Sequence, residues 1–173
     1  MIKTQVIDNF LNDKELLDNF YDNEILLGKI HLSFDNVGYK GNIPHSFTSS
    51  KNEQNFDEIY LIKKLHNKII EYFSIQKPFK RWHLNVYPSG YDGSIHTDYD
   101  KDSNIPTFLY IAVPSWEKSW GGEFILYDNN LEASEVVSCV KDRLIVFNGS
   151  LPHRAVGPTR LTSLLRTTIA FQF

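Results

Sequence analysis

Residues 81–98 read RWHLNVYPSGYDGSIHTD, and two patterns in this stretch constrain the chain most strongly. The first seven residues alternate between polar and apolar side chains, which is typical of a β-strand whose two faces meet different surroundings. The last three residues, His96-Thr97-Asp98, place an imidazole and a carboxylate two positions apart. Because positions i and i+2 of a strand point to the same side, the imidazole and the carboxylate can contact the same bound ion or molecule.

The alternation continues to the C-terminus in short segments separated by turn signals such as Asn148-Gly149. We expect strands at 81–88, 94–99, 107–113, 122–128, 135–140, 143–148, 152–157 and 164–173. Many short strands in succession favour a mainly β fold, an antiparallel sandwich or jelly roll. In the first and last strands we expect the polar sides to line a barrel interior and the apolar sides to pack on helices. The polar sides consist of Arg81, His83, Asn85 and Tyr87 in the first strand and Arg166, Thr168, Ala170 and Gln172 in the last.

The N-terminal part of the chain has a different period. It begins with an expected short strand at 4–7, followed by a helix capped by Asn12. Apolar residues at spacings of three or four then predict an amphipathic helix over 56–73. We therefore expect one domain over 1–173, in which residues 1–80 form a helical support region for a β core at 81–173.

Composition narrows the class of protein. Hydrophobic residues make up 42% of the 173 positions, which is enough for a packed core, and the net charge of −3 gives no footprint for nucleic acid. Cys139 is the only cysteine, so an internal disulfide is excluded. No apolar run approaches the roughly 18 residues of a membrane span. We expect a cytoplasmic protein with neither nucleic-acid nor membrane partners.

A metal site is the chemistry that His96 and Asp98 favour, with His153 as the expected third ligand. Fifty-four residues separate Asp98 from His153, which follows a Leu-Pro pair at the start of another expected strand. Two imidazoles and one carboxylate leave open coordination positions and suit non-haem Fe(II). A zinc hydrolase with the same three ligands is an alternative.

The order and spacing of several motifs within 81–173 resemble the Fe(II)/2-oxoglutarate-dependent dioxygenase superfamily, and within it the prolyl 4-hydroxylase-like branch. The motifs are Tyr87-Pro88-Ser89-Gly90-Tyr91, His96-Thr97-Asp98, Tyr110, Trp116, Trp120-Gly121-Gly122-Glu123, Arg143-Leu144-Ile145-Val146-Phe147, His153-Arg154 and Arg166-Thr167-Thr168-Ile169-Ala170-Phe171. The resemblance implies a double-stranded β-helix, with Fe(II) held by His96, Asp98 and His153. It also implies 2-oxoglutarate as co-substrate, O2 as oxidant, ascorbate as reductant, and hydroxylation of a C–H bond with release of succinate and CO2.

Arg166 is the residue that we expect to anchor 2-oxoglutarate. A buried dianion needs a fixed cation, and the planar guanidinium can bind a carboxylate through two parallel hydrogen bonds. Thr168 lies two positions along on the same polar side. Arg160 is a competing candidate, although it falls in a Pro-Thr-Arg turn. The resemblance further implies that Tyr110 hydrogen-bonds the same carboxylate and that Tyr87 lies near the metal end of the co-substrate.

Two questions stay open at this point. A non-catalytic jelly-roll module that binds a carbohydrate or a stabilising metal would also explain the aromatic residues and the fold, although it would not need Arg166. The substrate is a peptidyl proline, another protein side chain, a free amino acid or another small molecule. His83, on the polar side near Tyr87, contacts the co-substrate or the substrate, or makes a structural hydrogen bond.

Overall fold

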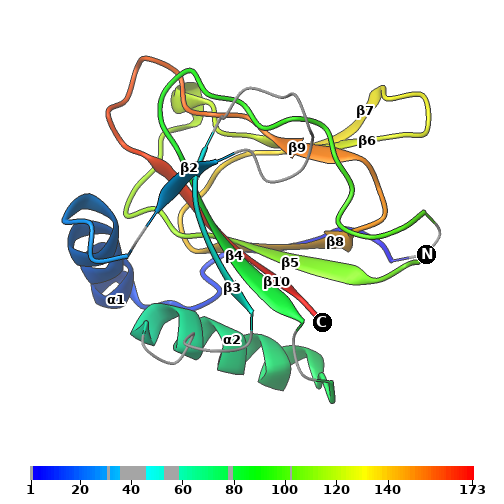
Figure 1. Cartoon of the computed structure of the whole chain (residues 1–173), viewed down its shortest axis with the longest axis horizontal. Helices are drawn as coiled ribbons and strands as arrows, with labels where there is room; N and C mark the ends of the chain where they lie inside the picture. Colours follow the sequence, from blue (N-terminus) through cyan, green and yellow to red (C-terminus); the bar gives the residue numbers. More distant parts are fainter. Residues whose placement is uncertain (1, 31, 36–45, 53–58, 78–79, 102) are drawn as a thin grey trace.

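The computed structural model describes residues 2–30, 32–35, 46–52, 59–77, 80–101 and 103–173, which form two antiparallel sheets and a helical layer (Figure 1). The larger sheet has the strand order β1-β8-β5-β10-β4-β3-β2, and the smaller has the order β7-β6-β9. The strands are β1 (Gln5–Ile7), β2 (Ser33–Asp35), β3 (Ser46–Asn52), β4 (Arg81–Tyr87), β5 (Pro106–Ile111), β6 (Phe124–Tyr127), β7 (Ala133–Val137), β8 (Arg143–Asn148), β9 (His153–Ala155) and β10 (Arg166–Gln172). This arrangement is the predicted double-stranded β-helix.

The helices cover the outer face of the large sheet, and the small sheet faces its inner side (Figure 1). They are α1 (Lys14–Asn19), the π-helix η1 (Phe20–Leu26) and α2 (Tyr60–Phe73), and a 3-10 turn, η3 (Lys118–Trp120), follows β5. None of the helices in the described ranges has the length and apolar character needed to cross a membrane.

Two hydrophobic clusters fill the two sides of the large sheet. The outer cluster joins the helices to the apolar residues of β4 and β10, among them Trp82, Leu84 and Ile169. The inner cluster lies between the sheets and includes Ile111, Phe147 and Ala170. The predicted separation of faces in β4 and β10 is therefore confirmed, and it leaves the polar sides of both strands facing the interior of the barrel.

Two details of the predicted elements are corrected. Asp13, not Asn12, caps α1, because its side chain accepts a hydrogen bond from the Leu16 backbone N–H at 3.0 Å. Asn12 instead adopts a left-handed φ of 53°. The predicted helix at 56–73 is observed from Tyr60 onward, and its first residues lie outside the described ranges.

The expected strand at 94–99 is reduced to a single bridge between His96 and His153. The backbone N–H groups of both Asp98 and Tyr99 donate to the carbonyl of Gly149, at 2.8 and 3.3 Å. This shared acceptor turns the chain, so the ladder cannot continue beyond His96. The bridge still ties the His96 segment directly to the start of β9.

Candidate metal centre

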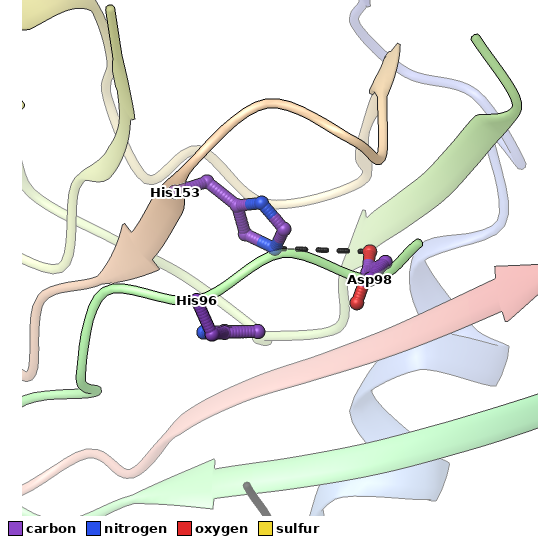
Figure 2. Close-up of side chains that lie close together, drawn as sticks. All are labelled: His96, Asp98 and His153. Atoms are coloured by element: carbon purple, nitrogen blue, oxygen red, sulfur yellow. Dashed lines mark ion pairs between the residues drawn. The ribbon is translucent and has the colours of Figure 1, made fainter. Parts of the chain in front are cut away.

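The side chains of His96, Asp98 and His153 converge between the two sheets (Figure 2). One possible ligand atom from each residue lies within 4.8 Å of the other two. His153 Nε2 is 3.7 Å from Asp98 Oδ2, and the two imidazole centroids are 4.4 Å apart. Three donors at this separation can close around one metal ion.

Both imidazoles are oriented by backbone carbonyls. His96 Nδ1 lies 2.9 Å from the Ser94 carbonyl oxygen, and His153 Nδ1 lies 2.8 Å from that of Leu151. A carbonyl only accepts, so each Nδ1 carries the proton and each Nε2 keeps its lone pair. Figure 2 shows the His153 Nε2 directed toward Asp98. This second layer of hydrogen bonds prepares the imidazoles as metal ligands.

The carboxylate and the buried imidazole are held just as firmly. Asp98 Oδ2 accepts a hydrogen bond from Thr107 Oγ at 2.7 Å, which limits the rotation of the carboxylate. The ring of His153 is buried against Phe147 and Phe124, with centroids 4.7 and 5.5 Å away. Burial holds the pKa of His153 below its ordinary value, although the Asp98 charge opposes the shift. The imidazole is therefore neutral at neutral pH and free to bind a cation.

Arg166 is fully buried at the start of β10, on the inner side of the large sheet. Its Nε donates to the Gly122 carbonyl oxygen at 2.7 Å. Its Nη1 and Nη2 atoms are buried and have no hydrogen-bond partner within the described part of the chain. Leaving a buried guanidinium without hydrogen-bond partners costs roughly several kcal/mol of folding free energy. The two free nitrogens match the two oxygens of a carboxylate.

The turn before β6 sets the direction of the Arg166 side chain. Gly121 and Gly122 have φ values of 74° and 82°, a region that favours glycine. A Cβ on Gly122 would lie 2.8 Å from a ring carbon of Trp116 and 3.3 Å from Arg166 Cδ. Because Gly122 has no side chain, its carbonyl oxygen can accept the hydrogen bond from Arg166 Nε while the Trp116 ring packs against the glycine.

The other residues that were predicted to bind the co-substrate lie in different parts of the structure. Tyr87 pairs with Arg166 across the β4–β10 ladder, and the Tyr87 ring centroid is 5.5 Å from the guanidinium. Thr168 lies on the same inner side, two positions further along β10. Arg160 is exposed in the turn that precedes β10.

Tyr110 is not brought to this side of the sheet. It belongs to the outer cluster, and its hydroxyl donates to Asp142 Oδ1 at 2.9 Å. In β5 the residues that face the barrel interior are its neighbours Leu109 and Ile111. We therefore leave Tyr110 out of the co-substrate site.

Two groups in the site were not anticipated from the sequence. Thr107 was not singled out, although a polar residue among inward-facing apolar positions of β5 is a usable signal. The other is the Gly122 carbonyl, which belongs to the Trp120-Gly121-Gly122-Glu123 motif but was given no role in the site. Its hydrogen bond to Arg166 joins residues 44 positions apart, so no local pattern predicts it.

The sequence over 82–171, just over half of the chain, matches the family model described as the 2OG-Fe(II) oxygenase superfamily. The matched range contains His96, Asp98, His153 and Arg166. No curated protein sequence matches the chain.

Several solved structures of prolyl hydroxylases have a similar fold. A Trichoplax adhaerens prolyl hydroxylase, in complex with a hypoxia inducible factor oxygen degradation domain peptide fragment, has a TM-score of 0.74 at 19% identity, over 98% of this chain and 82% of that one. A Pseudomonas putida prolyl-4-hydroxylase has a TM-score of 0.66 at 17% identity, over 98% and 91%. The collagen prolyl hydroxylase of Paramecium Bursaria Chlorella virus-1 has 0.62 at 17%, over 98% and 94%. At these identities the likeness shows a shared fold.

Proposed function

Because the chain belongs to the 2OG-Fe(II) oxygenase superfamily, we propose that it hydroxylates a C–H bond of an amino-acid residue or a free amino acid. In this proposal His96, Asp98 and His153 hold Fe(II), and Arg166 binds 2-oxoglutarate. The observation that carries it is the convergence of three prepared ligand atoms within 4.8 Å. A structural metal site would not require the buried Arg166 guanidinium on the inner side of β10.

The residues around the centre fit this pair of cofactors. Two imidazoles and one carboxylate suit Fe(II) and leave positions open for a chelating co-substrate. The unsatisfied Nη1 and Nη2 atoms of Arg166 would bind the distal carboxylate, with Thr168 and Tyr87 beside it. When bound, iron and 2-oxoglutarate together supply the oxidising chemistry, in which O2 is consumed and the 2-oxo acid becomes succinate and CO2.

The chain itself would position the reactants and exclude water. Phe124 and Phe147 pack against His153, and together with Ile111 they belong to the inner hydrophobic cluster, which gives the centre an apolar lining. This apolar lining strengthens the attraction between the Arg166 guanidinium and a bound carboxylate, because charges interact more strongly in a low dielectric. It also protects a reactive oxidant from solvent.

The proposed substrate class is less closely defined than the reaction. The solved structures with a similar fold are prolyl hydroxylases, one of them in complex with a peptide. A prolyl residue or another amino-acid side chain is therefore the first class to examine. Free amino acids are the second, since the same scaffold needs only a C–H bond beside the metal.

Succinate formation without added substrate tests the proposal. We expect the purified protein to convert 2-oxoglutarate to succinate when Fe(II), O2 and ascorbate are present, with ascorbate keeping the iron reduced. Omitting O2, adding a chelator or replacing Fe(II) with Zn(II) should each reduce the rate to background. Turnover that continues without O2 would indicate a hydrolase instead. No turnover under any of these conditions would overturn the proposed activity.

A further inference from the structure

The inner residues of β4 and β10 form four paired rows that run from Arg166 toward the opposite end of the site. Strand pairing places Arg166 beside Tyr87 and, at the far end, Gln172 beside Arg81. Arg166 and Gln172 are six positions apart along β10, which corresponds to roughly 20 Å. Arg81 is therefore too far from Arg166 to bind the same small dianion.

The row that contains Arg81 lies at the level of the metal ligands. Gln172 pairs on its other side with Thr107 of β5, and Thr107 binds the Asp98 carboxylate. The side chain of Arg81 is held there because its Nε donates to Gln172 Oε1. The Arg81 guanidinium thus stands near the metal centre, on the side away from Arg166.

This end of the site is positively charged. No carboxylate in the described ranges forms an ion pair with Arg81 or with its neighbour Lys80, whose ammonium lies 5.7 Å from the Tyr99 ring centroid. The formal charges of Fe(II), Asp98, the 2-oxoglutarate dianion and Arg166 cancel one another. An anion that approaches from the Arg81 side would therefore meet net attraction.

His83 adds a second unused polar group beside Arg81. Its Nε2 is buried and has no hydrogen-bond partner within the described residues. The residue across the ladder is Ala170, whose methyl side chain cannot form a hydrogen bond with the ring. Burial lowers the pKa of His83 to about 4, and the positive charge of Arg81 acts in the same direction. The unpartnered Nε2 can therefore form one hydrogen bond with a ligand, and it donates to a carboxylate oxygen in the tautomer that carries its proton on Nε2.

We propose that Arg81, assisted by His83, binds a carboxylate of the primary substrate, so that the substrate is an amino acid or peptide bearing a free carboxylate near the oxidised carbon. This inference rests on the proposed function. Gln172 occupies the Nε of Arg81 and leaves its two terminal nitrogens for the ligand, an arrangement that suits a planar carboxylate. The carboxylate comes from a free amino acid or from an Asp or Glu side chain in a peptide.

A panel of matched compounds tests this and separates the two sources. The first arm contains free amino acids, including proline, and the second their carboxamides. The third contains end-blocked peptides with Asp or Glu beside each candidate residue, and the fourth the same peptides with Asn or Gln. Gain of one oxygen atom is measured by mass spectrometry, together with succinate. We expect an acid to exceed its amide by roughly 10- to 100-fold in kcat/KM, the range for hydrogen bonds to a charged group.

Three variants connect the preference to the residue. Arg81→Gln should bring the acid-to-amide ratio close to one, whereas Arg81→Lys should keep part of it. A folding defect would lower both rates and leave the ratio unchanged. Lys29→Gln removes an exposed charge elsewhere and should keep the wild-type ratio.

The outcomes distinguish this inference from the proposed function. A preference for acids that Arg81→Gln removes supports the inference, and the arm in which it occurs identifies the source. Equal turnover of acids and amides, a ratio insensitive to Arg81→Gln, or succinate formation with no panel member oxidised would overturn this inference alone. Absence of any succinate formation would overturn the proposed function, and this inference with it.

Discussion

Alanine in place of His96, Asp98 or His153 is expected to remove succinate formation almost completely. Each substitution leaves only two protein donors for the metal. Loss of a group that merely orients a ligand commonly costs about 10- to 100-fold in metal affinity or activity, so loss of a ligand should cost at least about 100-fold. The measurements are succinate formed at saturating 2-oxoglutarate and iron bound per chain after gel filtration.

Folding has to be separated from metal binding in this series. His153 packs against Phe147 and Phe124, so its alanine variant removes part of the core contact as well as the ligand. Asp98→Ala changes a carboxylate at the edge of the core and is the cleaner test. Asp100→Ala removes an exposed carboxylate two positions away and serves as the control, with activity close to wild type. An Asp98→Ala protein that kept more than about a tenth of the activity would exclude this carboxylate as a ligand.

Substituting Arg166 should have its largest effect on the affinity for 2-oxoglutarate. Removing one partner of a buried ion pair typically costs about 3–5 kcal/mol, which corresponds to an increase in KM from roughly 10²-fold to several times 10³-fold for Arg166→Leu. Arg166→Lys keeps the charge but loses the planar pair of donors, so its effect should be smaller. Initial rates across a range of 2-oxoglutarate concentrations separate KM from kcat.

Two further variants locate the anchor. Arg160→Gln should leave KM for 2-oxoglutarate unchanged, because Arg160 is exposed in the turn before β10. Gly122→Ala should raise KM less than Arg166→Leu does, since an added Cβ would displace the Arg166 side chain without removing its charge. A large increase in KM for Arg160→Gln with none for Arg166→Leu would move the anchor to the turn.

Strands whose two faces meet different surroundings were predictable from the sequence. In β4 and β10 the inner side is polar and the outer side is packed on helices, so the alternation predicted both the strand and its orientation. The same alternation predicted that Arg166 faces the interior of the barrel. Local pattern is sufficient in such strands because polar residues line the inner side and apolar residues pack on the outer side, which leaves a period of two even where both sides are buried.

The sequence was less informative where both faces are buried or where a long-range contact decides. The β5 stretch Phe108–Ile111 is apolar or aromatic on both sides, so period alone cannot say which face Tyr110 joins, and the resemblance pointed to the wrong side of the sheet for the site described here. The segment at 94–99 read as a strand, but the Gly149 carbonyl turns it after His96. Neither the hydrogen bond from Tyr110 to Asp142 nor the hydrogen bonds to the Gly149 carbonyl leave a local signature in the sequence.

An anaerobic titration of Fe(II) into the protein, in the presence of 2-oxoglutarate, tests the central claim most directly. With iron and co-substrate on one centre, a weak visible charge-transfer band should grow and saturate at a single iron per chain. The band should be absent without 2-oxoglutarate and absent in Asp98→Ala. Iron that binds without producing the band, or a band that persists in Asp98→Ala, would contradict an iron centre built from His96, Asp98 and His153.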